Sequence, residues 1–473
     1  MRNYGPKTAT AELIAALVKD GMWLDYGCLQ PPKDFDRALA SRSKELNDVK
    51  VRLQCHLYPL EIMKADPEGK AFYLLNWHIL GLTRQYVKEG RGHYIPMNYG
   101  EMHHYYERIE PDIAVVTVSA MNKHGYFNFG PNVSYTREVL RKAKIKVLEV
   151  NESMPWVYGG YDESVHLSEV DYVYDNKYGD KIVEIQNPSP SEIDKVIAGY
   201  IAELIPLDGP TMQIGISGLP NAVLARLGEL GARDIGIHTE MLTDSMADLV
   251  EAGIITGQKK TFLPGKIVFT FSLGSRKLYD WMDHNPILAS YPVNFTNDPY
   301  VIAMNKNLVS INTCLGFDLQ GQVSSESIGT NIFTGTGGQL AFHRAAYYRS
   351  SPGQAPLGYP ENKGIIATYS TYSDKQGKLQ SRIRPTLQAG EIVTVPRTDT
   401  SYLVTEYGVA FLKGLSIPER AIELIKIAHP DFRDWLLEEA LKMGWIGKCW
   451  RVNGTSPKEH IAKMAKGLEP AEA

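Results

Sequence analysis

The chain has 473 residues, of which 44% are hydrophobic and 22% are charged, and its formal net charge is −4 at neutral pH. This length exceeds what one hydrophobic core usually supports, so two domains are expected. No apolar run reaches the roughly 18 residues that a membrane helix needs. The mild negative charge gives no reason to expect nucleic acid or an anionic membrane as a partner.

The four cysteines lie far apart, and no two of them form a CxxC pair. That spacing excludes a sequence-evident zinc site and argues against a disulfide scaffold. The N-terminus lacks the apolar segment of a signal peptide, so we expect a cytoplasmic protein.

The first part of the chain alternates amphipathic and apolar segments. Residues 9–27 predict a helix, a turn and a strand, and a second strand is expected within 50–60. Residues 112–130 predict a buried strand that runs into a polar loop, followed by a helix at 136–144 and a strand at 144–150. Strand, loop, helix and strand in this order are typical of a mostly parallel sheet.

A polar stretch with two prolines, at 184–193, is the best candidate for a domain boundary. After it, Ser191 is expected to cap a helix that runs to about residue 205, and 211–231 predict a strand, a glycine-rich turn and a helix. Further strands are expected at 234–240, 266–271, 308–319, 364–371 and 391–397, and helices at 416–444. Because both halves show the same order of elements, we predict an α/β fold of two similar open-sheet domains, residues 1–187 and 188–473.

Glu240 stands at the end of an expected strand, and ligands collect at the carboxyl ends of strands in open α/β sheets. Its carboxylate could be a catalyst, a metal ligand or a residue of a helix N-terminus. His238-Thr239-Glu240 is similar to the HxE of zinc deaminases, but the PCxxC that those enzymes need is absent. A catalytic carboxylate pair with Asp244 or Asp248 is a further alternative, although both residues fit the first turns of a helix that follows.

Two glycine-rich segments can expose backbone amides to an anion or to a developing oxyanion. The first, 213–221, lies between an expected strand and helix, and the second is 335–338. The first segment contains neither GxGxxG nor GxxxxGK[ST], which excludes a dinucleotide fingerprint and a P-loop. Each segment alone could be a plain turn. Together with a strand-end carboxylate, they indicate a site for a thioester or a phosphate group.

Three of four other polar segments are better explained by structure than by chemistry. His103-His104 is expected on a helix face rather than at a metal. Lys123-His124 fits a loop surface and a ligand contact at a strand end equally well. Cys314 lies in an apolar segment and is expected to be a buried small residue rather than a nucleophile. The pair Lys259-Lys260 predicts a solvated turn.

Ten segments, in their order along the chain, resemble the acetyl-CoA hydrolase/transferase family, a branch of the class I CoA-transferases. They are SAMNKHGYFNFG, LEVNESMPWVYGG, QIGISGLPNAVL, GIHTEMLTDSMADLVEAG, FSLGSRKLYDWMDHNP, NDPYVIAMN, DLQGQVSSESIG, GTGGQ, VTVPRTDTSYLVTEYGVAFLKG and RAIELIKIAHPDFR. No segment is decisive alone, but ten in the right order make the resemblance specific. Within the family, the chain most resembles the butyryl-CoA:acetate and 4-hydroxybutyrate CoA-transferases.

The resemblance implies two α/β domains with the active site in the cleft between them. Glu240 matches the family's nucleophile, and Asn297 matches an active-site asparagine. Gly337 and Gly338 match the glycine loop that places an amide at the reacting carbonyl.

The resemblance also assigns residues to the binding of coenzyme A. A basic contact falls near Lys363, and Gly337 and Gly338 are also expected to contact coenzyme A. Gln213 and Gly215, which we place among the catalytic residues, stand on the strand side of the first glycine loop. The loop residues themselves are Ser217, Gly218, Leu219, Pro220 and Asn221.

The implied reaction moves coenzyme A between an acyl-CoA and a carboxylic acid such as acetate through a glutamyl-CoA thioester on Glu240. Acyl-CoA and acids are then substrates, a homodimer is expected, and neither a permanently bound cofactor nor a metal is implied. An acyl-CoA hydrolase would use the same residues with water in place of the second acid. A non-catalytic CoA-binding protein is the third alternative, although binding alone needs no carboxylate at position 240.

The chain departs from the family pattern at places that flank the acyl side of the site. Ala341 stands where an aspartate is usual, and residues 343–346 replace a VRGA segment. Gly316 lies in a segment that replaces ALEVDL, and residues 98–101 replace a GMHL-type segment. Because Ala341 and Gly316 are small, we hypothesise that they make room for a bulkier acyl group.

Overall fold

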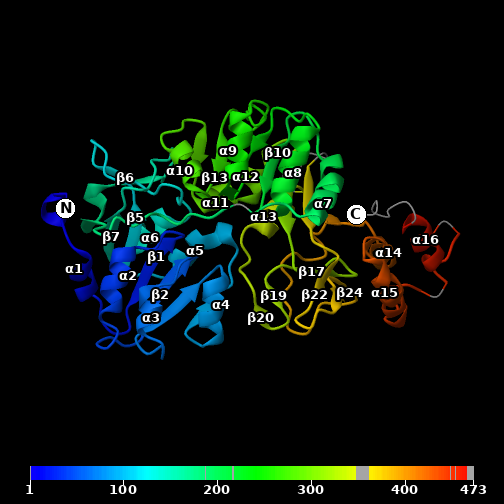
Figure 1. Ribbon diagram of the computed structural model, residues 1–473, viewed down its shortest axis with the longest axis horizontal. Coiled ribbons are helices and arrows are strands. Elements are labelled where there is room, and N and C mark those ends of the chain that lie inside the picture. Colours follow the sequence, from blue (N-terminus) through cyan, green and yellow to red (C-terminus); the bar gives the residue numbers. More distant parts are fainter. Residues whose placement is uncertain are drawn as a thin grey trace.

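The computed structural model describes residues 2–186, 188–215, 218–347, 362–447, 449–452 and 454–465. It has an α/β architecture with one large sheet in each half of the chain, which confirms the predicted fold class (Figure 1). We call residues 1–187 the N-terminal half and residues 188–473 the C-terminal half. In Figure 1 the N-terminal half is blue and cyan and lies at the left, and the red helix α16 lies at the far right.

The N-terminal half is built on a seven-stranded sheet in the order β4-β3-β2-β1-β5-β7-β9. All neighbouring strands run parallel. A parallel sheet is normally covered on both faces, and every residue of β5 is buried. The strands are β1 Trp23–Cys28, β2 Val49–Gln54, β3 Phe72–Asn76, β4 Gly92–Tyr94, β5 Ile113–Val118, β7 Ile145–Val150 and β9 Tyr172–Asp175.

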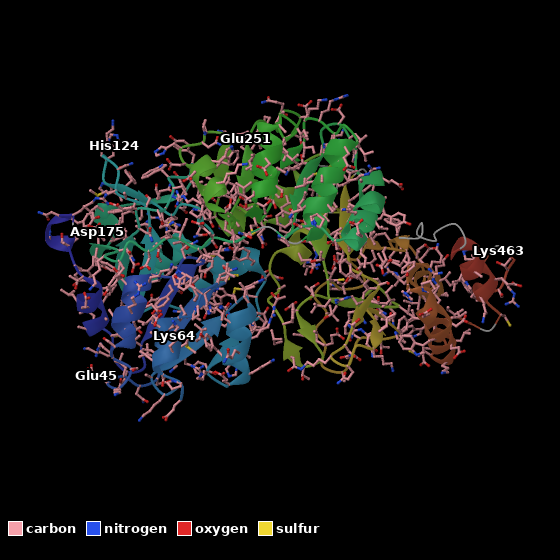
Figure 2. The ribbon with its side chains drawn as sticks, viewed as in Figure 1. Glu45, Lys64, His124, Asp175, Glu251 and Lys463 are labelled. Atoms are coloured by element: carbon pink, nitrogen blue, oxygen red, sulfur yellow. The ribbon has the colours of Figure 1, made fainter. Side chains whose placement is uncertain are left out.

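Short helices connect these strands, and one antiparallel hairpin projects from the sheet. The helices are α1 Ala11–Ala16, α2 Lys33–Ala40, α3 Glu61–Ala65, α4 Gly81–Lys88, α5 Met102–Tyr106 and α6 Thr136–Lys142, with 3-10 turns η1 Gly5–Lys7, η2 Tyr99–Glu101 and η3 Leu167–Glu169. The hairpin pairs β6 Tyr126–Asn128 with β8 Ser164–His166. The loop before β6 carries His124 at the outside of the molecule (Figure 2), so of the two alternatives for Lys123-His124 the structure shows the loop surface.

The C-terminal half is built on a six-stranded sheet in the order β11-β10-β16-β21-β25-β26, in which only β26 runs antiparallel to its neighbour. A bridge between His238 and Val268 extends it from β11 to β13. The strands are β10 Thr211–Ile214, β11 Gly236–Ile237, β16 Leu308–Thr313, β21 Lys363–Ala367, β25 Tyr402–Thr405 and β26 Gly408–Phe411.

The predicted start of helix α7 (Glu192–Glu203) is confirmed, because Ser191 and Asp194 form a reciprocal capping box there. The other helices are α8 Gly218–Glu229, α9 Asp244–Glu251, α10 Arg276–Met282, α11 Val293–Thr296, α12 Pro299–Ala303, α13 Gln339–Ala345, α14 Ile417–Lys426, α15 Pro430–Lys442 and α16 Pro457–Ala465. In the described parts of the chain, no helix is long and apolar enough to span a membrane.

Smaller strand pairs decorate the C-terminal half. They are β12 Met241–Leu242 with β14 Phe271–Ser272, β13 Ile267–Phe269 with β15 Leu288–Ser290, β19 Ser327–Ile328 with β20 Asn331–Ile332, β22 Thr371–Ser373 with β23 Leu379–Ser381, and β17 Gly316–Asp318 between β18 Val323–Ser324 and β24 Ile383–Arg384. The strand expected at 308–319 is therefore two strands, β16 and β17, which belong to different sheets.

Two predicted features are wrong. The strand expected at 391–397 is an irregular segment with a single bridge from Val395 to Val323, and Pro396 cannot donate a ladder hydrogen bond. The edge of the sheet is formed by β25 and β26 instead. Lys260 is not in a solvated turn: it is 4% exposed, because its ammonium donates to the carbonyl oxygens of Ile237 at 2.8 Å and Lys266 at 2.7 Å. Only Lys259 is exposed as expected.

The two halves meet where the carboxyl ends of their strands face each other. One apolar cluster joins residues that follow the N-terminal strands, among them Trp77 and Tyr99, to Met241 and Phe271 of β12 and β14. Burying this shared surface fixes the halves against each other. The carboxyl edge of each parallel sheet, where ligands usually bind, is thereby brought to the same interface.

Candidate active site

The main chain of Glu240 is held between two strands at the end of β11. The amide of Thr239 donates to the carbonyl of Val268 at 2.9 Å, and the amides of Thr270 and Phe271 donate to the carbonyl of Glu240 at 3.1 and 3.2 Å. Helix α9 begins only at Asp244. The interpretation of Glu240 as a helix N-terminal residue is therefore wrong, and its side chain leaves a rigid strand end.

The carboxylate of Glu240 accepts two hydrogen bonds. Asn297 Nδ2 donates to Oε2 at 2.6 Å, and the backbone N–H of Gly338 is the second donor. Burial nevertheless raises the pKa of Glu240 from 4.5 to about 7, since it outweighs the effect of both donors. Position 338 admits no side chain, because a Cβ there would collide with the Glu240 carboxylate and the Asn297 amide.

The structure thus brings together Glu240, Asn297 and Gly338 from three separate elements: the end of β11, the C-terminus of α11 and the loop before α13. Gly337 lies beside them in a left-handed conformation (φ +59°), which glycine adopts without strain. Its carbonyl accepts a hydrogen bond of 3.2 Å from the amide of Tyr99 in the N-terminal half.

The second glycine loop is anchored on the N-terminal half by groups that sequence reasoning missed. Thr334 Oγ1 lies 2.9 Å from His78 Nε2, next to the end of β3. Tyr94, at the end of β4, accepts from the amide of Thr336 at 3.0 Å and donates to Glu326 at 3.2 Å. The sequence held no signal for these contacts, because each joins residues more than 200 positions apart.

Arg84 and Trp77 add to this anchorage. Arg84 Nε donates to the carbonyl of Phe333 at 2.6 Å, and its guanidinium lies 3.6 Å from the centre of the Phe333 ring. Gly335 is packed so closely on the Trp77 carbonyl that a Cβ would collide with it. The loop belongs to the C-terminal half by sequence, where Thr336 Oγ1 donates to Glu326 at 2.9 Å, but it is also anchored on the N-terminal half.

The first glycine loop is held within the C-terminal half. The amide of Gly215 donates to the carbonyl of Ile311 at 3.1 Å. A Cβ on Gly218 would lie 2.8 Å from the carboxylate of Asp194. Asn221 donates to the carbonyl of Pro188 at 3.2 Å.

The other residues expected in this loop are placed as follows. Leu219 and Pro220 are buried in the first turn of α8. Gln213 is engaged on β16, where its Oε1 accepts from Ser310 Oγ at 2.6 Å and from Asn312 Nδ2 at 3.0 Å. Ser217 lies outside the described residues. The structure gives Gln213 and Asn221 hydrogen bonds within the protein, and not to Glu240.

Lys363 is not brought to this group. It is the first residue of β21 and pairs with Val309, whereas the site lies at the carboxyl ends of the strands. At about 3.3 Å per residue, the four residues to Ala367 put Lys363 about 13 Å from that edge. The slip of about two residues that the resemblance allows spans 361–365, of which residue 361 lies outside the described residues.

The alternative chemistries proposed for Glu240 do not fit its surroundings. Both ring nitrogens of His238 are engaged within the protein, at 2.9 Å from the Thr296 carbonyl and 3.2 Å from Asn305 Nδ2. Asp244 accepts from Ser275, and Asp248 pairs with Lys277, so neither forms a carboxylate pair with Glu240.

A metal is not indicated elsewhere either. Within the described ranges, no group of three or more His, Cys, Asp or Glu side chains could hold a metal ion. His103-His104 lies in helix α5, as predicted. Cys314 is buried, as predicted, and burial raises its pKa to about 12, so the thiol is not a ready nucleophile.

A cavity of about 370 Å³ opens beside the Asn297 side of the site. Its walls come from both halves: Asn98, Gly100, Glu101, His103, His104, Asn294, Asn297, Asp298, Pro299, Leu340, Ala341 and Arg344. Two segments that depart from the family pattern, 98–101 and Ala341, therefore line one cavity. Gly316 is not part of the lining of this cavity. A side chain at position 316 would collide with the Arg382 carbonyl and lie 2.8 Å from Arg384 Nη2. The hypothesis that Gly316 makes room for an acyl group is wrong.

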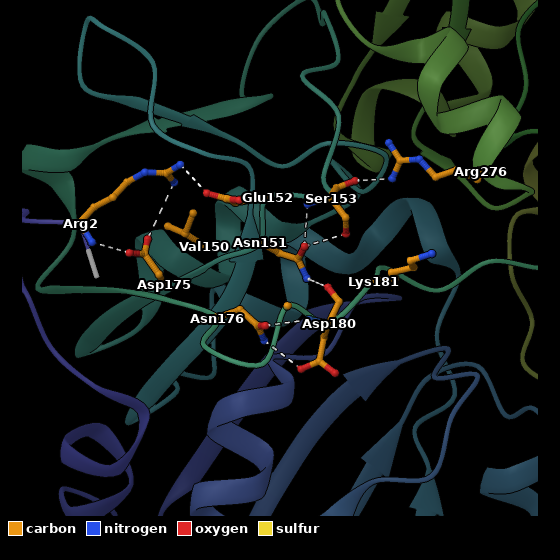
Figure 3. A pocket seen from close by; sticks show the side chains of 11 residues that line it. Arg2, Val150, Asn151, Glu152, Ser153, Asp175, Asn176, Asp180, Lys181 and Arg276 are labelled. Atoms are coloured by element: carbon orange, nitrogen blue, oxygen red, sulfur yellow. Dashed lines mark hydrogen bonds and ion pairs between the residues drawn. The ribbon is translucent and has the colours of Figure 1, made fainter.

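A wider pocket of about 810 Å³ lies at the carboxyl ends of β7 and β9 and contains none of the expected site residues (Figure 3). Its polar groups bond to one another: Arg2 pairs with Glu152 at 2.6 Å, and Asn151 Nδ2 donates to the Asp180 carbonyl at 2.7 Å. Arg276 donates to the carbonyl of Ser153 at 2.8 Å. These contacts satisfy the pocket lining internally, so we assign no chemistry to it.

Comparison with known proteins finds matches along most of the chain. The model of the acetyl-CoA hydrolase/transferase N-terminal domain matches residues 1–185, and that of the C-terminal domain matches residues 274–440. The butyryl-CoA:acetate CoA-transferase of Anaerostipes caccae is 41% identical over 460 residues, which cover 95% of this chain and 98% of that protein.

Solved structures give the same result. The crystal structure of RipA from Yersinia pestis is 34% identical and matches with a TM-score of 0.82, over 94% of this chain and 99% of that one. The 4-hydroxybutyrate CoA-transferase of Porphyromonas gingivalis is 32% identical and matches with a TM-score of 0.72, over 92% and 98% of the two chains.

Proposed function

This chain belongs to the acetyl-CoA hydrolase/transferase family and is a CoA-transferase, and on that premise we propose that Glu240 is the group that carries coenzyme A between two acids. The donor is an acyl-CoA of the butyryl or 4-hydroxybutyryl kind, and the acceptor is a carboxylate such as acetate. The observation that carries the proposal is the Glu240 carboxylate, which is held by Asn297 Nδ2 and the Gly338 amide where the two sheets meet.

The first half of the reaction forms two covalent species in turn. The Glu240 carboxylate attacks the thioester carbon, the C–S bond breaks, and a mixed anhydride forms as the CoA thiolate leaves. The thiolate then attacks the glutamyl carbon of the anhydride, which releases the first acid as a carboxylate and leaves glutamyl-CoA. The second acid runs the same two steps in reverse, so no proton, metal or redox group is consumed.

The two donors on the Glu240 carboxylate suit these steps. Asn297 Nδ2 bonds to Oε2, which leaves Oε1 without that donor for attack on the thioester. When the thiolate attacks the glutamyl carbon, negative charge grows on a glutamyl oxygen, where Asn297 and the Gly338 amide can stabilise it. A donor of this kind lowers the activation barrier by about 3 kcal/mol.

We assign the binding of coenzyme A to the first glycine loop. Helix α8 begins at Gly218, and the free amides of a helix N-terminus favour negatively charged groups. Gly218 to Asn221 form the first turn of this helix, and we assign Ser217 to the same loop. Gln213 lies in the strand before the helix, and Gly215 follows that strand. Lys363 is not included, because it stands at the opposite end of its strand.

The cavity beside Asn297 supports a role for Ala341 on the acyl side, where its small side chain leaves room for a larger acid. The domain boundary at residues 187/188, the homodimer and the cytoplasmic location stay predictions. Light scattering at several protein concentrations tests the homodimer.

The direct test follows free thiol and new acyl-CoA from butyryl-CoA, with and without acetate. A transferase gives acetyl-CoA only when acetate is present, with little free thiol. Release of thiol at the same rate without acetate would show a hydrolase. If neither product forms with butyryl-CoA, 4-hydroxybutyryl-CoA and bulkier acyl-CoAs are assayed in the same way, and no transfer with any of them would refute the proposal.

A further inference from the structure

His238 is conspicuous because the proposed reaction does not use it, although it lies only two residues before Glu240. Its side chain is completely buried. Burial lowers the pKa of the imidazole to about 3, and the buried ammonium of Lys260 nearby also opposes protonation. The ring is therefore neutral, with one N–H donor and one acceptor nitrogen.

The surrounding hydrogen bonds decide which nitrogen carries the proton. Asn305 Nδ2 has two protons: one is directed to the carbonyl of Ile302 at 3.0 Å and the other to His238 Nδ1 at 3.2 Å. His238 Nδ1 is therefore the acceptor, and Nε2 carries the hydrogen. Nε2 donates to the carbonyl of Thr296 at 2.9 Å.

Hydrogen bonds to buried groups of the C-terminal half hold Asn305 in place. Its carbonyl accepts from Asn362 Nδ2 at 3.3 Å, and Asn362 Oδ1 accepts from the amide of Leu308 at the start of β16. A chain of fixed groups thus runs from the main sheet through Asn305 to His238.

The Thr296 carbonyl belongs to the peptide group that joins Thr296 to Asn297. Fixing this carbonyl fixes the peptide plane from which the Asn297 side chain departs. The helix holds the other side of this peptide group, since the amide of Asn297 donates to the carbonyl of Val293 at 2.9 Å, whereas the Thr296 hydroxyl lies 3.4 and 3.5 Å from two carbonyl oxygens. Asn297 Oδ1 is buried and has no partner among the described residues, so no protein group fixes the amide from its far side.

We propose that His238 is a positioning residue: by holding the Thr296 carbonyl through its Nε2–H, it keeps the Asn297 amide on the Glu240 carboxylate. The proposal rests on the proposed function of Glu240 and Asn297. The segment that extends strand β11 thus supplies both Glu240, the nucleophile, and His238, which orients the Asn297 donor on it. A displacement of that donor by about 1 Å would cost about 100-fold in rate.

The test compares two substitutions, each of which can keep the hydrogen bond of only one ring nitrogen of His238. The amide of His238→Gln reaches the position of Nε2 and can still donate to Thr296, whereas that of His238→Asn reaches only the position of Nδ1. The readouts are covalent CoA adduct formation in a single turnover, followed by mass spectrometry, CoA affinity by calorimetry and melting temperature. We expect His238→Asn to form the adduct about 100-fold more slowly with unchanged CoA affinity, and His238→Gln to stay within about threefold of the unsubstituted protein.

A double-mutant cycle separates positioning from general support of the fold. If His238 acts through Asn297, His238→Asn should change the adduct rate by less than about threefold in an Asn297→Ala background, because the coupled group is already gone. An equal loss in both backgrounds would overturn the proposal. So would equal rates for His238→Gln and His238→Asn, or a loss of CoA affinity in step with rate.

A further variant keeps the test decisive if His238→Asn does not fold. Asn305→Ser removes the donor to Nδ1 but leaves the imidazole in place, and we expect about a tenfold slower adduct formation; an unchanged rate overturns the proposal. If the unsubstituted protein forms no adduct at Glu240, it is the proposed function that fails, which this comparison distinguishes from failure of the role of His238.

Discussion

The two glycine-rich loops near Glu240 differ in what holds them. The first, 213–221, is bonded within the C-terminal half, as shown by Gly215 on β16 and Gly218 against Asp194. The second, 335–338, follows β20 in the chain but is anchored on His78, Tyr94 and Tyr99 of the N-terminal half.

This difference indicates that the two halves have different roles in the reaction. The C-terminal half carries the nucleophile and the loop assigned to coenzyme A, so we expect the CoA moiety to be bound by that half. The N-terminal half holds the amide that faces the reacting carboxylate, so the chemical step needs both halves docked together. Substitutions in the first loop should then change substrate affinity, and substitutions in the second loop or its anchors should change the rate of the chemical step.

The largest effect is expected at Glu240, the proposed nucleophile. Glu240→Gln should lower transfer by about 10⁴-fold or more, because an amide cannot form the anhydride, while coenzyme A still binds. Steady-state transfer and calorimetry with CoA measure the two properties. Asp248→Asn, on the exposed face of α9 where Asp248 pairs with Lys277, is the matched control and should keep full activity.

The next effect contrasts the loops directly. Gly338→Ala places a methyl group against the Glu240 carboxylate and the Asn297 amide, and we expect kcat to fall about 100-fold, or about 3 kcal/mol, with little change in KM. Gly218→Ala meets Asp194 at 2.8 Å and should mainly raise the KM for acyl-CoA. Gly199→Ala in α7, where a Cβ meets nothing within 4 Å, is the control. If Gly338→Ala and Gly218→Ala gave the same pattern, the division of labour would be wrong.

Loss of one anchor should have a smaller effect. Tyr94→Phe removes only the hydroxyl that accepts from Thr336 and donates to Glu326. We expect kcat to fall about tenfold, the equivalent of about 1.4 kcal/mol, with CoA affinity unchanged, because a hydrogen bond that involves a charged partner contributes on this scale. Tyr178→Phe, at a side chain that is 60% exposed, should have no effect. A rise in the KM for CoA in Tyr94→Phe would contradict the assignment of this loop to the chemical step.

The pH dependence tests the environment that both halves create around Glu240. Its pKa is raised to about 7 by burial, and only the ionised form attacks, so kcat/KM should rise with pH up to about 7 and then level off. The raised pKa also means that the folded state holds this proton more tightly than the unfolded state. The free energy of unfolding should therefore fall as pH rises from about 4.5 to about 7, and Glu240→Gln should lack that fall. An acid limb near 4.5 in the unsubstituted enzyme would contradict a buried carboxylate.

Much of the fold could be predicted because its signals are local. The strand that ends before Glu240 and the helix from Asp244 follow from an apolar run and the polar residues after it, and Ser191 caps α7 as predicted. The local pattern failed at 391–397, because the only β-bridge of this segment joins Val395 to Val323. It failed also at Lys260, because two carbonyls from separate segments replace water around the ammonium.

The sequence by itself determined the order of α/β elements, the strand-end carboxylate, the two glycine loops and the family resemblance, since these depend on neighbours along the chain. Only the tertiary structure decided which of those parts meet. It placed Asn297 and Gly338 on Glu240, docked the second loop on His78 and Tyr94, and left Lys363 at the far edge of the sheet. The reason is physical: hydrogen bonds and buried contacts between residues 50 to 250 positions apart are set by how the sheets pack, which no local pattern records.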